Sequence, residues 1–202
     1  MPSLQGIAQH LPELALAMAL AWGSGLRLYA TLFCIGGAGF LGWIELPSHL
    51  QVLASPVVLA ASGFMTFVEF FADKLPWLDS VWDVVHTAIR IPAGAALAAA
   101  VFGDSGTATA LAAAILGGAV SGSTHLTKAG GRAAINASPE PFSNWLASFT
   151  EDAAVPAGLW LALAHPVAFL VLLCLFLLLA IFAIRWIVRG VRHLFSKVLA
   201  AR

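Results

Sequence analysis

The stretch VAFLVLLCLFLLLAIFAI at residues 167–184 carries no polar side chain along its whole length. An α-helix of about 20 apolar residues is long enough to cross the hydrocarbon core of a bilayer. The rest of the 202-residue chain is similar, because 60% of all residues are hydrophobic and only 10% are charged. Soluble domains carry roughly 25% charged residues. The sequence therefore predicts an integral membrane protein.

The remaining bulk features exclude several classes of protein. A formal net charge of zero excludes a basic nucleic-acid binder. Cys34 and Cys174 lie in apolar runs and give no disulfide framework. The segment from Met1 to Glu13 has no Lys or Arg, so we expect no cleavable signal peptide. No His-Glu-x-x-His pair, phosphate-binding loop or Gly-x-Ser-x-Gly elbow points to an enzyme.

The chain contains six apolar segments, which are separated by glycine, proline and charged residues. They predict an all-α membrane protein with about six transmembrane helices in a single domain, residues 1–202. The segments cover about 14–43, 50–71, 81–102, 107–135, 142–164 and 167–184.

The distribution of basic residues predicts the orientation in the membrane, because cytoplasmic loops are rich in Lys and Arg. Half of the basic residues follow the last segment, in a tail at residues 185–202: Arg185, Arg189, Arg192, Lys197 and Arg202. We expect a multi-pass protein of the bacterial inner membrane with a cytoplasmic C-terminus and, after six crossings, a cytoplasmic N-terminus. The tail is either an ordinary cytoplasmic anchor or a segment that binds anionic lipid.

Two apolar segments contain small polar residues at which a helix can be interrupted, Ser24-Gly25 in the first and Ser121-Gly122 in the fourth. We therefore expect two broken helices. Pairing the segments in order suggests a 3+3 inverted repeat with halves at 11–102 and 106–190, as in many secondary transporters. Chance similarity in a chain rich in alanine and glycine is the alternative.

Arg27 lies in the middle of an apolar segment, just after Gly23-Ser24-Gly25. An ionisable side chain at the centre of a membrane helix costs about 2.5–3.5 kcal/mol, so it usually faces a cavity or a partner. A helix that restarts beside it would add free N–H groups, which favour an anion. We expect Arg27 to point inward, toward either a bound anion or one buried acid.

Further ionisable residues form stripes at helical spacing. Acidic residues dominate the first set, which can relay protons or ligate a hard divalent cation, or in part cap a helix in the headgroup layer. The second set is basic and has two acids within reach. The first set is Glu69, Asp73, Asp79, Asp83, His86 and Arg90, and the second is His125, Lys128 and Arg132, with Glu151 and Asp152.

Three motifs carry a family resemblance: GSGLRLY at 23–29, EFFADKLP at 69–76, and DSVWDVVHTAIR at 79–90. With them the chain resembles, over about residues 14–165, the bacterial membrane proteins catalogued as domain of unknown function 4126. The resemblance implies a helical membrane domain and no established activity. A looser likeness is to cation/proton exchangers related to the lysine exporters, but their Glu-x-Gly-Asp-Lys motif is only approximated at Glu69 to Lys74.

These features lead to the hypothesis of a small transporter or permease with a polar site at the membrane midplane, open to proton coupling. The expected partners are membrane lipids and a small ion or anionic solute; a homo-oligomer stays open, and no cofactor is expected apart from a divalent cation. The alternatives are a divalent-cation/proton exchanger and a non-transporting scaffold or lipid-handling factor. The predicted pathway is lined by Ser24, Gly25, Arg27, Glu69, Asp73, Asp83, His86, Arg90, Ser121, His125, Lys128, Arg132, Glu151 and Asp152.

Overall fold

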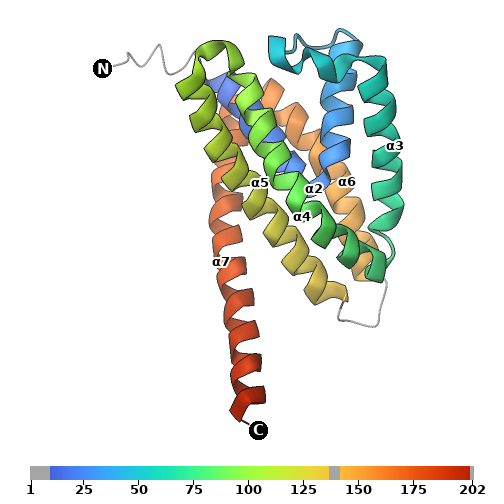
Figure 1. Cartoon of the computed structure of the whole chain (residues 1–202), viewed down its shortest axis with the longest axis vertical. Coiled ribbons are helices and arrows are strands. Elements are labelled where there is room, and N and C mark those ends of the chain that lie inside the picture. The colour runs from blue at the N-terminus through green and yellow to red at the C-terminus, as the bar shows by residue number, and fades with distance from the viewer. Residues whose placement is uncertain (1–9, 137–141, 201–202) are drawn as a thin grey trace.

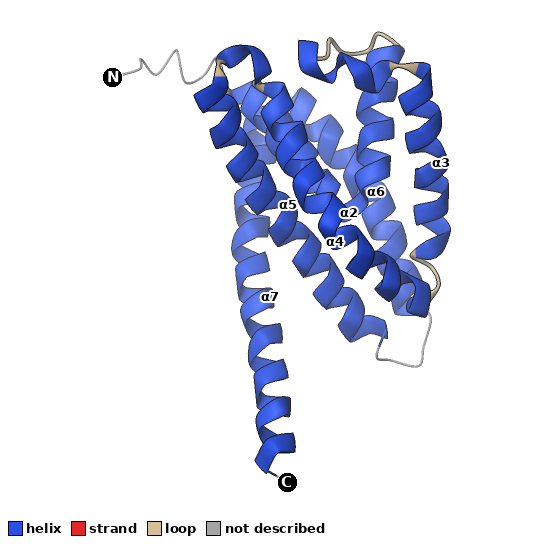
Figure 2. Cartoon of the chain, viewed as in Figure 1, coloured by secondary structure: helices blue, strands red, loops and turns tan. Residues whose placement is uncertain are grey.

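The computed structural model describes residues 10–136 and 142–200, and this part of the chain is helical with no strand (Figure 2). The all-α prediction is therefore confirmed. Prolines suit the first turn of a helix because its N–H groups have no intrahelical partner, and several helices begin at one. The elements are α2 (Leu11–Phe40), η1 (Ser48–Ala54), α3 (Pro56–Ala72), α4 (Pro76–Val101), η2 (Gly103–Ser105), α5 (Thr107–Asn136), α6 (Phe142–Ala164) and α7 (Pro166–Ala200).

Several of these helices are long and apolar enough to cross a membrane. Among the described residues, α2, α4, α5 and the Pro166–Trp186 part of α7 meet that criterion alone. η1 and α3, which meet at an angle of 66°, add a fifth if taken together. α6, which carries Glu151 and Asp152, is not among them. A multi-pass membrane protein is confirmed, whereas the count of six crossings is not.

α2 folds back on itself at Arg27. The backbone of Arg27 is extended, with φ −143° and ψ 84°, between two helical arms at 11–26 and 28–40. A Cβ built on Gly23 would lie 2.5 Å from Oγ1 of Thr31, eight residues later. In a straight helix residues eight apart are about 12 Å apart along the axis, so the two arms must lie against each other at the tip.

Both ends of α2 therefore lie at the same end of the bundle. Leu11 lines a cavity together with Val167, at the start of α7, and Leu41 lines another together with Ala164, at the end of α6. The first arm is only about 24 Å long, which is less than the roughly 30 Å of a bilayer core. α2 is therefore a helix that folds back on itself (Figure 1), and the residue at its tip, Arg27, is 1% exposed.

This path changes the predicted topology. From η1 onward the helices run alternately from one end of the bundle to the other, and the start of α2 and the end of α7 lie at opposite ends (Figure 1). The predicted placement of both termini on the cytoplasmic side is not confirmed. That prediction counted a 30-residue apolar segment as one crossing, whereas the chain turns at Arg27 and returns.

The second predicted break is absent. α5 is one α-helix from Thr107 to Asn136, through Gly117-Gly118 and Ser121-Gly122. Its glycine positions serve close packing instead, since a Cβ on Gly117 would lie 2.8 Å from the carbonyl oxygen of Gly94 on α4. Because α2 turns back and α5 does not, the correspondence behind the inverted repeat of 11–102 and 106–190 is not confirmed.

α2 lies at the centre of the bundle and packs against α3, α4, α5, α6 and α7. Its first arm is almost completely buried, including Ala15, Ala17 and Leu20. Large apolar side chains such as Phe64 and Phe67 on α3 are exposed, as expected for a surface that faces lipid. α7 continues as a helix into the basic tail, where Arg185 and Arg189 are exposed; the side chains of Arg192, Lys197 and Arg202 are not among those that the structure describes.

Candidate functional site

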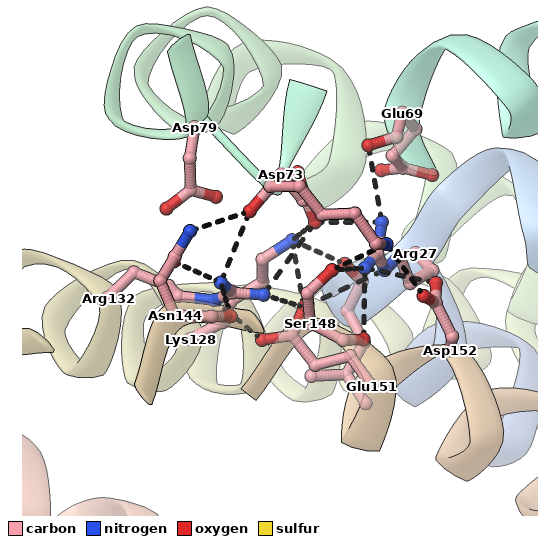
Figure 3. A network of polar contacts seen from close by, with 12 residues as sticks. Arg27, Glu69, Asp73, Asp79, Lys128, Arg132, Asn144, Ser148, Glu151 and Asp152 are labelled. Carbon is pink, nitrogen blue, oxygen red and sulfur yellow. Dashed lines mark hydrogen bonds and ion pairs between the residues drawn. The ribbon is translucent and has the colours of Figure 1, made fainter. Parts of the chain in front are cut away.

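Ionisable side chains from five elements meet inside the bundle (Figure 3). They form two groups that touch through Lys128. The Arg90 cluster comprises Glu69, Asp83, Arg90 and His125. The Glu151 cluster comprises Arg27, Asp73, Lys74, Lys128, Arg132, Glu151 and Asp152.

Arg27 occupies the tip of α2 and points inward, as predicted. Its guanidinium lies 2.8 Å from the Asp73 carboxylate and 3.0 Å from that of Asp152, and its Nε lies 3.6 Å from Glu151. It also donates to the hydroxyl of Ser148 at 2.9 Å. The side chain is 1% exposed. Arg27 is therefore held by three acids at once, rather than by the single acid of the simpler hypothesis.

Glu151, on α6, forms ion pairs with three cations of this cluster. Arg132 donates to both of its carboxylate oxygens, at 3.1 Å and 3.0 Å, which is the bidentate geometry of a strong arginine–carboxylate pair. Lys128 lies 3.3 Å away. With Arg27, three cations surround one carboxylate. That carboxylate is 14% exposed, so it is less enclosed than its partners Arg132 and Lys128.

Lys128 joins the broken helix to the acids. Its ammonium lies 3.0 Å from Asp73 and 3.5 Å from Asp83, and donates to the carbonyl oxygen of Leu26 at 3.1 Å. Because α2 leaves helical geometry at Arg27, carbonyl groups at the end of its first arm lose their intrahelical donors. A cation at the C-terminal end of a helix arm satisfies such a carbonyl and complements its dipole. Lys128 therefore stabilises the turn.

The Arg90 cluster is enclosed between α2, α3, α4 and α5. Arg90 lies 2.5 Å from Glu69 and 2.8 Å from Asp83, and both acids are at most 3% exposed. Asp83 and Arg90, which share one helical stripe, are thus paired. The hydroxyls of Ser24 and Ser121 both donate to the carbonyl oxygen of Arg90. These serines, predicted as helix breaks, fasten three helices together instead.

The neighbours of His125 determine its tautomer. Arg90 can only donate, and it lies 3.3 Å from Nδ1, so Nδ1 is the acceptor. Nε2 then carries the proton and faces the Thr87 hydroxyl at 2.7 Å, which in turn donates to the carbonyl of Asp83. A second proton on Nδ1 would point at a guanidinium. His125 is therefore held neutral.

His86 lies beside this cluster and is bonded differently. Its Nδ1 lies 2.8 Å from the carbonyl oxygen of Trp82, which only accepts, so Nδ1 carries the proton. Nε2 accepts from the Tyr29 hydroxyl at 3.2 Å. Both ring nitrogens of His86 therefore face oxygen atoms, whereas Nδ1 of His125 faces a guanidinium. The structure places His86 next to the network rather than within its ion pairs.

Gly25 lies on α2, and Lys74 lies between α3 and α4. A Cβ on Gly25 would lie 2.5 Å from the carbonyl oxygen of Ser121, so Gly25 provides close contact between α2 and α5. α3 ends at Ala72 and α4 begins at Pro76. Lys74 lies there, 3.4 Å from Asp152, and burial lowers the pKa of its ammonium although Asp152 opposes the shift.

Four residues of the site were not predicted from the sequence. Asn144 is buried on α6, accepts from Arg132 and donates to the carbonyl of Asp73. Ser148 binds Arg27. The remaining two are Tyr29 and Lys74. Asn144, Ser148 and Glu151 follow one another at spacings of four and three, the same helical stripe that identified the other sets.

The acids pair with cations rather than with one another. Among residues 10–136 and 142–200, no group of three or more His, Cys, Asp or Glu side chains is arranged to hold a metal ion. One oxygen each of Glu69, Asp73 and Asp83 is buried without a hydrogen-bond partner. Such oxygens are costly in a membrane interior, which means that the network retains capacity for a proton or a donor.

A cavity of about 210 Å³ borders the Glu151 cluster. Its polar lining is Lys128, Arg132 and Glu151 with Thr124 and Thr127. Its apolar lining comes from four helices and comprises Leu26, Gly131, Ile135, Ala147 and Phe176. The cavity gives the Glu151 cluster a neighbouring space that a small group can occupy.

Comparison with known proteins identifies the family. The family model described as domain of unknown function DUF4126 matches residues 14–186, so the chain belongs to that family, as the motifs predicted. No curated protein and no solved structure matches the chain.

Proposed function

We propose that this member of the DUF4126 family is a small transporter of the bacterial inner membrane that moves a solute bearing an anionic group. The observation that carries the proposal is the position of Arg27 at the tip of a re-entrant helix, where three acids from two other segments hold it. Re-entrant helices place irregular backbone at membrane depth where it is buried in protein or lines a pathway.

The energetics of the network support a functional role. Four cations, Arg27, Arg90, Lys128 and Arg132, are buried almost completely among apolar helices. Each ionisable group at a helix centre costs about 2.5–3.5 kcal/mol on insertion scales, and such groups commonly mark ion or substrate pathways. An apolar bundle of this size would be cheaper to insert. Retaining so many charges therefore favours a task that needs them.

The shared partners suggest how an anion would move. Glu151 and Asp73 each face Arg27, Lys128 and Arg132, so these cations can exchange one acid for another without losing all contact. A solute carboxylate or phosphate would enter the same exchange. Glu151 is the proposed proton-coupled carboxylate, because it borders a cavity. Glu69, in contrast, is buried and paired with Arg90.

The charges also support an orientation. Lys74, Arg132 and the exposed Arg185 and Arg189 lie toward the end of the bundle at which α7 ends, which by the positive-inside rule is cytoplasmic. The start of α2 then lies on the opposite side. That placement agrees with the absence of Lys and Arg from residues 1–13.

The scaffold remains the second candidate, and one observation favours it: every cation of the network is already paired with an acid of the protein. The divalent-cation exchanger has less support, because the acids of the network are paired with Arg and Lys side chains. In an exchanger of that kind several oxygen ligands would converge on one point.

The test combines a ligand screen with flux. Purified protein is screened for thermal stabilisation by phosphate, sulfate, acetate, succinate and Mg²⁺, because a ligand of the folded state raises stability. Stabilising anions are then tested for uptake into proteoliposomes, with Arg27→Ala and, as a matched control on the exposed tail, Arg185→Ala. We expect Arg27→Ala to lower flux by more than about tenfold and Arg185→Ala to leave it unchanged.

Equal flux in wild type and Arg27→Ala would remove Arg27 from the mechanism. A protein that no anion stabilises and that transports none of the panel would support the scaffold instead.

A further inference from the structure

The cavity beside Glu151 is lined by both charged and apolar side chains. Lys128 and Arg132 line it, and their charged groups, at most 2% exposed, are occupied by acids of the network such as Glu151. Leu26, Ala147 and Phe176 provide apolar surface from α2, α6 and α7. A soluble ion needs only the charged part of this lining. A molecule with a charged head and a hydrocarbon tail fits both.

We infer that this cavity binds the anionic headgroup of a membrane amphiphile, and that the Glu151 carboxylate occupies the headgroup's place when the site is empty. The inference rests on the proposed function and names its substrate class. The chemistry is that of a carboxylate or phosphate oxygen held by an arginine fork and a lysine ammonium.

The geometry of Glu151 supports its role as an internal substitute. Its two oxygens take the bidentate position on Arg132, and one of them also lies 3.3 Å from Lys128. A ligand oxyanion needs that same position. Because Glu151 is 14% exposed, it is the least enclosed member of these ion pairs and the one that a ligand can displace.

Thr124 supplies an independent observation. It lines the cavity and is completely buried, yet its hydroxyl has no hydrogen-bond partner. Threonines in membrane helices normally bond to the backbone one turn earlier, as Thr127 does with Ser123 at 2.8 Å. An unpartnered buried hydroxyl is unfavourable in the empty protein, and it would donate a hydrogen bond to an anionic ligand.

The position of the cavity favours an amphiphile over a soluble anion. It lies between α5, α6 and α7, and α5 and α6 make few contacts with each other. α7 diverges from both toward its C-terminal end (Figure 1). Phe176 lies within the most apolar span of the chain, so this wall of the cavity is at hydrocarbon depth.

The experiment measures binding to purified protein in an uncharged detergent. The probes are oleate, oleyl alcohol as its uncharged analogue, and acetate as the headgroup alone. We expect oleate to bind at least about tenfold more tightly than either analogue, since only oleate uses both parts of the lining. Equal binding of acetate and oleate would overturn the amphiphile, and equal binding of oleyl alcohol would overturn the role of the cations.

Two variants test the residues. Thr124→Val should leave the stability of the empty protein unchanged or raise it, and should weaken oleate binding by about tenfold, the value of one hydrogen bond to a charged group. Thr66→Val is the matched control, because Thr66 bonds only to Ser62 within α3, away from the cavity. Thr124→Val that binds oleate as wild type does would contradict the assignment.

Glu151→Gln removes the competing charge. The empty variant should unfold at a lower temperature, because three cations lose their shared carboxylate, and saturating oleate should restore most of that loss. Loss of stability without rescue by oleate would assign Glu151 a structural role only. Oleate binding in the absence of any flux would contradict the proposed transport and leave this site standing, so the two failures are distinguishable.

Discussion

The Arg90 cluster and the Glu151 cluster use the same chemistry in different surroundings. In the Arg90 cluster, one guanidinium holds two acids that are at most 3% exposed, and a histidine with a fixed neutral tautomer closes the remaining side. In the Glu151 cluster, three cations share one acid that is 14% exposed and borders a cavity.

The difference indicates that the Arg90 cluster holds the helices in place, whereas the Glu151 cluster can exchange its ion-pair partners. A fully enclosed pair can leave its geometry only by exposing a bare charge to apolar surroundings, so it keeps helices in fixed positions. A partly exposed acid among several cations can be replaced by a ligand group of the same charge. We therefore assign the Arg90 cluster to the stability of the bundle and the Glu151 cluster to its function.

The largest effect on stability is expected at the enclosed cluster. Glu69→Ala leaves the buried Arg90 without its closest acid and should lower the free energy of unfolding by about 3–5 kcal/mol. Asp152→Ala is the comparison in the other cluster. Its carboxylate is 26% exposed, so its loss should cost no more than about 1 kcal/mol.

Denaturation of both variants in detergent micelles measures the difference. Equal losses in the two variants would mean that the division into a fixed and an exchangeable cluster is wrong.

A smaller effect is expected where α2 contacts α5 between the clusters. Gly25→Ala places a methyl group 2.5 Å from the carbonyl oxygen of Ser121 and should cost about 1–3 kcal/mol by overpacking. Gly37→Ala, on the second arm of α2, is the matched control. Its Cβ would meet nothing within 4 Å, so alanine should stabilise that arm by about 0.5–1 kcal/mol.

The same denaturation measurement applies to this pair. If Gly25→Ala is as stable as Gly37→Ala, the two helices are not in close contact at the tip of α2.

Much of this molecule could be predicted from composition and spacing. The charged stripes, the inward direction of Arg27 and the Asp83–Arg90 pair follow from helical periodicity and the cost of a charge in hydrocarbon. Asn144, Ser148 and Glu151 follow the same helical spacing. The first two residues are uncharged, so a search for charged stripes did not identify them.

The path of the chain could not be predicted from local sequence. Ser24-Gly25 and Ser121-Gly122 are the same dipeptide, yet α2 turns beside the first and α5 continues through the second. What differs is tertiary: Lys128, far along the chain, binds the carbonyl of Leu26 that the turn leaves without an intrahelical donor. The pairing of Lys128 with Asp73, from another helix, is likewise beyond any local pattern.

The central claim is that α2 returns to the side from which it started, which places Arg27 inside the bundle. Single cysteines at His10 and at Ser196, with Cys34 and Cys174 replaced by alanine, can be labelled in intact cells with a membrane-impermeant maleimide. The account predicts that His10→Cys is labelled from outside and Ser196→Cys only after the cells are opened. Protection of both positions in intact cells would show that the termini share the cytoplasmic side and would contradict the re-entrant helix.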